Sequence, residues 1–336
     1  MREVIDGFVK SLTIGEGATV EGMTLFPVFW KGASPLRYKV LSQALADGSV
    51  EVREKGSATV PELYLVNRSD SMVLVMGGEE VVGGKQNRMV NTSFLIGPKA
   101  EVDLAVTCLE QGRWRDVAPR FSGGETAYHS LRRTTNSQVR EHLRSVGAPR
   151  TDQGAVWHEI AEKQQDFGVK SPTRAMHDIY KQTSKGLSDF EEAFPLVDGA
   201  VGLAVGLSGK MTGVDVFDQP ETAARLWSRL VRSYAMDALR IPPADPVEPD
   251  RAKRLIERLA GARAESYPSP GLGQDVRLEG DGAEGSALVY EDVVVHLAIF
   301  RTHESRSGSR GSGMASASRR QGMHRRTSRE RSGDST

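Results

Sequence analysis

"PELYLVNRSDSMVLVMGGEE", residues 61–80, contains two apolar runs separated by the turn-forming residues Asn67 to Asp70. Each run is short and rich in Val and Leu, which predicts two β-strands with a change of chain direction between them. Residues 18–30 and 48–56 alternate apolar and polar side chains, and residues 101–109 form a further apolar run before Gly112. Short strands joined by polar turns, with no helices between them, are typical of an antiparallel sheet or sandwich.

The middle of the chain predicts helices. Residues 130–147 and 152–168 carry apolar residues at helical spacing, and each segment ends at a glycine. We expect a third helix to begin near Ser171. Ser188 and Glu191 have the spacing of a capping box, which predicts a short fourth helix starting there.

The last third predicts a hairpin and returning strands. Residues 199–218 form two apolar runs around a turn at Ser208 to Gly213, and an amphipathic helix follows Pro220. A second helix over 250–262 precedes the closing strands at 286–300. The predicted fold class is therefore α+β, with an antiparallel N-terminal sheet or sandwich packed with a helical middle segment and returning C-terminal strands, in one domain spanning 1–301.

Charge is distributed unevenly although the chain is formally neutral. Residues 302–336 contain eight arginines and three carboxylates, a net charge of +5, so the rest of the chain carries −5. This Arg/Ser/Gly-rich tail has almost no apolar residues and is predicted to be disordered. Such a tail can bind the phosphates of RNA or DNA weakly. A solvated tail without a partner, or a read-through in a shifted frame, fits its composition equally.

The composition also restricts the compartment and the kinds of site. No apolar run approaches the roughly 20 residues that cross a bilayer, and the first ten residues lack the features of a secretion signal. The single cysteine, Cys108, excludes an internal disulfide, which fits a reducing compartment. We expect a cytoplasmic protein with no membrane association. The seven histidines have no paired spacing, so no metal site is predicted.

Residues 77–91, "GGEEVVGGKQNRMVN", are unusually polar for a segment between predicted strands. By period-two alternation, Glu110 falls on the same face as Val106 and Cys108 at the end of its strand. A carboxylate on a buried face needs a cation or hydrogen-bond donors. If the two segments meet, we expect a polar cluster of Glu80, Lys85, Gln86, Asn87, Arg88, Glu110 and Arg113.

The common nucleotide-binding loops do not fit this segment. A phosphate loop ending at Gly84-Lys85 would need glycine at position 79, which is Glu79, and serine or threonine at 86, which is Gln86. The turn at Gly209-Lys210 fails in the same way. No Gly-x-Gly-x-x-Gly pattern opens a helix.

"GGEEVVGGKQNR" followed by "VTCLEQGRW", residues 106–114, resembles the ADP-ribosylglycohydrolase-and-rhodanese-phosphatase-superfamily-associated domain family. "VWHEI", "MTGVDVFD" and "VVVHLAIF" also look like this family, so the resemblance extends over roughly residues 15–300 and excludes the tail. It implies an association with ADP-ribose or RNA-processing gene products. It implies no particular reaction.

Three interpretations of the cluster remain open. In the structural one, Glu110 and Arg113 join the strand end to the loop by hydrogen-bonded ion pairs. In the binding one, Lys85, Gln86, Asn87, Arg88 and Arg113 bind a phosphorylated, nucleotide-like or ADP-ribose-like ligand. In the catalytic one, Glu80 or Glu110 has a raised pKa and performs acid/base hydrolysis or transfer on such a ligand. A non-catalytic scaffold for protein partners is a further alternative, and no cofactor is indicated.

Other polar or reactive residues have weaker signals. Cys108 can be a nucleophile but fits a small core residue better. His296 either satisfies a core hydrogen bond or reaches the cluster. Asp215 and Asp218 can bind Mg²⁺, and turn chemistry beside Gly213 explains Asp215 equally well.

Overall fold

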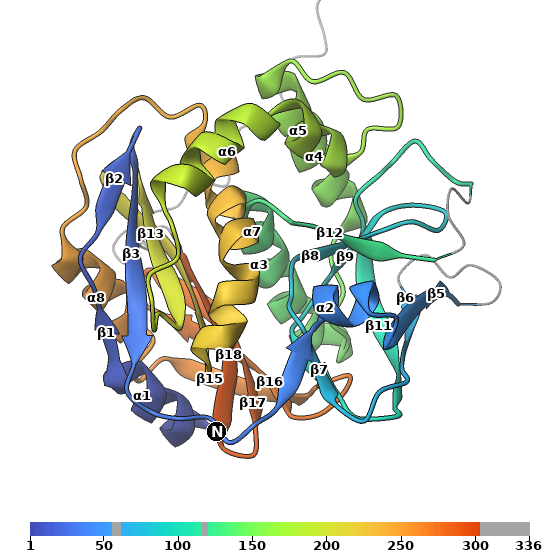
Figure 1. The fold of residues 1–336 in the computed structure, drawn as a ribbon, viewed down its shortest axis with the longest axis horizontal. Helices are drawn as coiled ribbons and strands as arrows, with labels where there is room; N and C mark the ends of the chain where they lie inside the picture. Colours follow the sequence, from blue (N-terminus) through green and yellow to red (C-terminus); the bar gives the residue numbers. More distant parts are fainter. Residues whose placement is uncertain (56–61, 116–119, 303–336) are drawn as a thin grey trace, which may run out of the picture. The chain divides into compact units, whose positions relative to one another are not determined.

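The two apolar runs of residues 61–80 form strands β6 (Glu62–Asn67) and β7 (Met72–Val75), which belong to different sheets. The computed structural model describes residues 1–55, 62–115 and 120–302, and within them the chain forms three β-sheets and eight α-helices (Figure 1). The predicted tail lies outside the described residues, except for Thr302. The α+β fold class is confirmed.

The turn between β6 and β7 follows from the side chain of Asn67. Its Nδ2 donates to the carbonyl oxygens of Ser71 and Gly97, both at 2.8 Å, and its Oδ1 accepts from the backbone N–H of Ser69 at 3.0 Å. An asparagine that bonds its own downstream backbone stabilises a turn. The predicted turn is therefore present, and it passes the chain from one sheet to another.

The largest sheet has nine strands within the described part of the chain, and all of its pairs are antiparallel. Its strands in spatial order are β1 (Leu12–Ile14), β3 (Met23–Trp30), β13 (Gly202–Leu207), β14 (Lys210–Phe217), β18 (Val293–Arg301), β17 (Ala283–Tyr290), β16 (Gln274–Gly280) and β15 (Arg263–Pro268), with β2 (Ala18–Val20) paired to β3. The predicted hairpin is β13–β14, whose turn is Ser208-Gly209. N-terminal and C-terminal strands thus share one sheet.

The other two sheets come from the N-terminal half. A six-stranded sheet has the order β12 (Ser122–Thr126), β8 (Glu79–Val82), β9 (Arg88–Val90), β11 (Glu101–Cys108), β6 and β5 (Val50–Glu54). A three-stranded sheet contains β10 (Phe94–Ile96), β7 and β4 (Tyr38–Val40). The pair β4–β7 is parallel, unlike the antiparallel pairs expected from sequence. A parallel pair needs a long crossover connection, and the chain from residue 41 to 71 supplies one.

Helices cover both faces of the large sheet. On one face α3 (His129–Val146) and α7 (Pro220–Ala238) separate it from the smaller sheets (Figure 1). The predicted apolar face of α7, including Leu226, Leu230 and Tyr234, is buried there. On the other face α1 (Arg2–Ser11) and α8 (Pro249–Glu257) bury Ile5, Phe8 and Leu255 among others. The remaining helices are α2 (Leu41–Ala46), α4 (Gln153–Phe167), α5 (Met176–Gln182) and α6 (Ser184–Ala193).

Several predicted boundaries require correction. The ends of α3 and α4 at Gly147 and Gly168 are as predicted. The third middle helix starts at Met176 rather than near Ser171, and the fourth starts at Ser184. Ser188 is therefore inside α6, where its hydroxyl donates to the carbonyl oxygen of Ser184 at 3.0 Å instead of capping the helix. Two helices, α1 and α2, form in the third of the chain where only strands were expected.

In the part of the chain that the structure describes, none of the helices combines the length and apolar character needed to span a bilayer.

Candidate functional site

The two polar segments predicted to meet do lie together. Strand β9 pairs with both β8 and β11, so that Glu80 faces Met89 and Cys108 faces Arg88. We call the seven predicted site residues the motif cluster. Strand pairing therefore brings Glu80 from β8, Arg88 from β9 and the loop between them to the C-terminal end of β11.

Glu110 and Arg113 form the centre of the motif cluster. Arg113 donates from Nε to Glu110 Oε2 at 2.7 Å, and its Nη2 lies 2.6 Å from the same oxygen. The guanidinium also donates to Gly84 O at 2.6 Å and to Asn87 Oδ1 at 3.0 Å. Burial alone raises the pKa of Glu110, but hydrogen bonds from Arg113 and Thr173, with the Arg113 charge, hold it below its ordinary value. Glu110 is thus favoured as a carboxylate.

Glu80 is at the other side of the motif cluster and is almost fully buried. It accepts from Asn87 Nδ2 at 3.4 Å and from the backbone N–H of Glu125 at 3.3 Å, and it lies 3.0 Å from His177 Nδ1. The hydrogen bond to Glu80 is the largest cause of a raised pKa at His177. His177 and Glu125 were not among the site residues predicted from sequence.

Lys85, Gln86 and Arg88 complete the motif cluster. Arg88 is 1% exposed and donates from Nη1 to Gln86 Oε1 at 3.2 Å. Glu54 on β5 lies 3.8 Å from Arg88 Nη2 and accepts from the backbone N–H of Lys85 at 2.9 Å. The cationic groups of Lys85 and Arg88 lie over the ring of Trp114, which is 52% exposed.

All seven predicted residues are therefore brought together, and side-chain hydrogen bonds link Asn87 to Glu80, Arg88 to Gln86, and Arg113 to Glu110 and Asn87. Arg88 Nε is a buried donor without a partner among the described residues. The ion pair of Glu110 and Arg113 and the hydrogen bond from Arg113 to Gly84 join the strand end to the loop, as the structural interpretation expects. The binding and catalytic roles assigned to these residues stay predictions. The neighbouring Cys108 is buried, and burial raises the pKa of its thiol, as expected of a core residue.

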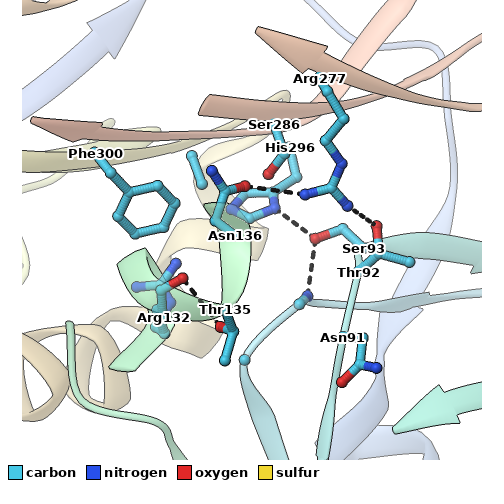
Figure 2. Close-up of a pocket in the computed structure, with 13 residues that line it drawn as sticks. Asn91, Thr92, Ser93, Arg132, Thr135, Asn136, Arg277, Ser286, His296 and Phe300 are labelled. Carbon is cyan, nitrogen blue, oxygen red and sulfur yellow. Dashed lines mark hydrogen bonds between the residues drawn. The ribbon is translucent and has the colours of Figure 1, made fainter. Parts of the chain in front are cut away.

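A second polar site, which was not predicted, includes residues 91–93 at the end of β9, the strand that carries Arg88. It is a small hollow: water-sized molecules can occupy about 30 Å³ of it, within about 340 Å³ of space that is free of protein atoms and partly open to solvent. Its walls come from the loop of residues 91–93, one face of α3, and the strands β16 to β18 (Figure 2). Gly77 and Gly78, the first residues of the polar segment, also line it. We call this site the polar hollow.

Arg277 on β16 is one of two buried cations in the polar hollow. Its Nη2 donates to Asp275 Oδ2 at 2.6 Å and to Thr92 Oγ1 at 2.9 Å, and its Nη1 donates to Asn136 Oδ1 at 3.0 Å. Figure 2 shows the Arg277 guanidinium between Asn136 on α3 and Thr92. Arg277 thus joins a helix, a strand and a loop around the polar hollow.

Arg132 on α3 is the second cation, and it pairs with Asp215 on β14. Both Nη atoms of Arg132 donate to the two Asp215 oxygens, with 3.0 Å for the Nη1 bond. Tyr234 donates to the same carboxylate at 2.9 Å. Burial favours the neutral acid, but the Arg132 charge and hydrogen bonds from His296 and Arg132 hold the pKa of Asp215 far below its ordinary value. Asp215 is a buried strand residue, so turn chemistry does not explain it.

His296 on β18 connects this ion pair to the loop. Its Nε2 lies 3.4 Å from Asp215 Oδ1, and its Nδ1 lies 2.8 Å from Ser93 Oγ. Burial lowers the pKa of His296 despite the neighbouring Asp215, so the imidazole is neutral near pH 7. Of the two alternatives predicted from sequence, the first is found: His296 satisfies hydrogen bonds inside the fold, and one of its partners, Ser93, lines the polar hollow.

Three donors at the polar hollow have no partner among the described residues. They are Arg132 Nε, Arg277 Nε and Asn136 Nδ2, and all three side chains are more than nine-tenths buried. Buried donors without partners are uncommon because each costs about 1–3 kcal/mol. Three that line one hollow indicate an acceptor-rich ligand or ordered water.

No arrangement of three or more His, Cys, Asp or Glu side chains suited to a metal ion occurs in residues 1–55, 62–115 and 120–302. Asp215 and Asp218, considered from sequence as Mg²⁺ ligands, instead bond Arg132 and Tyr38 respectively.

Comparison with known proteins gives one match. Neither the curated proteins nor the solved structures contain a significant match to this chain. A family model described as the ARG and Rhodanese-Phosphatase-superfamily-associated Protein domain matches residues 11–300, which include the strands of the three sheets except for Arg301, the last residue of β18. This chain therefore belongs to the ARG and Rhodanese-Phosphatase-superfamily-associated Protein domain family.

Proposed function

We propose that this protein binds a small phosphorylated ligand, nucleotide-like or ADP-ribose-like, and that the polar hollow receives a phosphate group of that ligand. The observation that carries the proposal is the group of three unpartnered buried donors, Arg132 Nε, Arg277 Nε and Asn136 Nδ2. The ionised oxygens of a phosphate group accept hydrogen bonds, and arginine is well suited to bind them.

The charge balance of the polar hollow fits a ligand held by hydrogen bonds. Arg132 and Arg277 are each paired with one aspartate, Asp215 and Asp275. The two pairs keep the site close to neutral before a ligand enters, and they fix both guanidinium groups in place. Water-sized molecules can occupy only about 30 Å³ of the polar hollow, so it can take one small group of a ligand, and the rest of that ligand would lie outside it.

The proposal keeps the ligand class expected from sequence and changes the position of the phosphate. In the motif cluster the guanidinium of Arg113 already donates to Glu110, Gly84 and Asn87, which leaves little capacity for a ligand. A lowered pKa also makes Glu110 a poor general acid near neutral pH. Among the described residues the motif cluster has one buried donor without a partner, Arg88 Nε, whereas the polar hollow has three.

A thermal-shift experiment on the full chain tests the proposal. The probes are inorganic phosphate, pyrophosphate, AMP and ADP-ribose. A probe at 100 times its Kd stabilises the fold by about 2.7 kcal/mol, which raises the Tm by several degrees. We expect such a rise with at least one probe. A protein-interaction scaffold predicts no rise with any of them.

Two variants locate the bound probe. Asn136→Asp keeps an oxygen that accepts from Arg277 and replaces the unpartnered donor by a negative oxygen, so it should retain the fold and lose the shift. Lys85→Gln removes a cation of the motif cluster and should leave the shift unchanged. The reverse pattern would place the ligand in the motif cluster and refute the polar hollow.

A further inference from the structure

Ser93, His296 and Asp215 form a continuous hydrogen-bonded series at the edge of the polar hollow. Ser93 Oγ lies 2.8 Å from His296 Nδ1 and accepts the backbone N–H of Gly77 at 2.8 Å. On the other side of the ring, His296 Nε2 lies 3.4 Å from Asp215 Oδ1. Figure 2 shows the Ser93 hydroxyl directed toward the imidazole, with Thr92 and Arg277 beside it.

The direction of these hydrogen bonds follows from the charge of Asp215. Its carboxylate is ionised and can only accept, so His296 must place its proton on Nε2 to bond it. The Nδ1 of the neutral ring then has a lone pair and accepts from Ser93. Because Gly77 N–H also donates to Ser93 Oγ, the serine proton has one acceptor in this series, the imidazole.

We propose that Ser93 is a nucleophile for the phosphoryl group bound in the polar hollow and that His296 is its general base. This proposal rests on the proposed function, because it uses the same phosphate site. Ser93 is half-buried, so its hydroxyl can be reached from the polar hollow, whereas His296 behind it is 2% exposed. The site resembles the general arrangement of an activated serine, a base and an orienting carboxylate.

The reaction balances as hydrolysis of a phosphate ester. The Ser93 proton moves to His296 Nδ1 as Oγ forms a bond to phosphorus, and the bond from phosphorus to the leaving oxygen breaks. The imidazolium gives its proton to that leaving oxygen, which departs as an alcohol. In the second half, His296 takes a proton from water as the water oxygen forms a bond to phosphorus. The bond from phosphorus to Ser93 Oγ breaks, and the imidazolium returns its proton to Oγ, which releases inorganic phosphate and restores Ser93 and neutral His296. The unpartnered donors of Arg277 and Asn136 would bond the phosphoryl oxygens, where charge develops.

Labelling with diisopropyl fluorophosphate tests the nucleophile in the full chain. We expect one adduct per chain, located on the Ser93 peptide by mass spectrometry and absent from Ser93→Ala. Ser71→Ala is the matched control, because Ser71 is another half-buried serine that does not line the polar hollow. It should be labelled at the wild-type rate. Labelling at another residue, or none, would overturn the proposal.

His296→Gln tests the base. Loss of a general base slows a reaction by about 100-fold or more, so the labelling rate should fall by at least that factor. Wild-type labelling in a folded His296→Gln variant would exclude His296 as the base. If this variant does not fold, Ser93→Cys replaces it, because a cysteine beside a histidine base should react with iodoacetamide near pH 7 much faster than free cysteine. A rate equal to that of free cysteine would then refute the role of His296.

Thermal shift and labelling together distinguish a wrong phosphate site from a wrong nucleophile. If inorganic phosphate stabilises both wild type and Ser93→Ala but Ser93 is not labelled, the phosphate site stands and the nucleophile is refuted. If Ser93 is labelled but no phosphate compound stabilises the protein, the nucleophile stands and the proposed ligand class is wrong.

Discussion

Arg132 and Asp215 form a buried ion pair that joins helix α3 to strand β14 at the centre of the large sheet. Their side chains are 3% and 0% exposed, and both guanidinium Nη atoms bond the carboxylate. The carboxylate also accepts from Tyr234 and lies beside His296. The pair therefore positions Arg132 in the polar hollow. It also favours the His296 tautomer with its proton on Nε2, because Asp215 accepts from that nitrogen.

Asp215→Asn should be strongly destabilising, because it leaves the Arg132 charge buried without its counter-ion. We expect the free energy of unfolding to fall by about 3–5 kcal/mol in urea titrations. Lys39→Gln breaks the exposed pair with Asp47, whose atoms are 2.7 Å apart, and should cost less than about 1 kcal/mol. Equal costs for the two variants would contradict the structural importance of the buried pair.

The motif cluster was predictable because its signals are local and its strands are recognisable. Two apolar runs flank the polar segment, and alternation along β11 correctly placed Glu110 at the end of a buried face. The same local signals gave the β13–β14 hairpin and the ends of α3 and α4. The sequence did not predict which strands pair with one another. For example, β6 and β7 are adjacent in sequence but belong to different sheets.

The polar hollow could not be assembled from sequence because its contacts are far apart along the chain. Arg277 bonds Thr92 across 185 residues, and Ser93 bonds His296 across 203. One signal was available: Asp275 and Arg277 are two residues apart, so a strand would place both on one face as an ion pair. The strand itself was missed, since "QDVRLEG" contains three charged residues and resembles a loop.

Stability should fall with acidification because His129 is buried in its neutral form. Burial, the largest cause, lowers the pKa of His129 to about 4. The unfolded chain binds this proton near pH 6.5, so the contribution is complete above that pH and is lost as the pH falls toward 4. Between pH 7 and pH 5 the loss from this residue should be about 2 kcal/mol, by the same linkage relation.

Urea titrations of wild type and His129→Gln at the two pH values measure that loss. The buried His296 also has a lowered pKa and contributes in the same direction, so only the difference between the two proteins belongs to His129. The variant should show the smaller change with pH. An identical pH dependence in both proteins would mean that His129 is not kept neutral by the fold.

Glu110→Gln tests whether the motif cluster is structural. It removes the charge that balances Arg113, whose side chain is 7% exposed, and should lower the free energy of unfolding by about 2–4 kcal/mol. Thermal unfolding measures this loss, and phosphate at high concentration should still raise the Tm of the variant. A variant as stable as wild type that no longer responds to phosphate would instead support a ligand site in the motif cluster.

Gly78→Ala should disturb both the fold and the polar hollow. The φ angle of Gly78 is +95°, and an added Cβ would lie 3.0 Å from Arg132 Nε and 3.1 Å from its Cδ and Cγ. The backbone strain and the displaced Arg132 should lower stability by about 1–3 kcal/mol, and the phosphate-induced shift should decrease. Gly48→Ala is the matched control, since Gly48 has a φ of +72° but nothing within 4 Å of an added Cβ. Gly48→Ala should lose stability through backbone strain alone, and phosphate should raise its Tm as much as that of wild type. If Gly78→Ala also leaves that response intact, the position of Arg132 does not control phosphate binding, and the polar hollow would lose one of its three proposed donors.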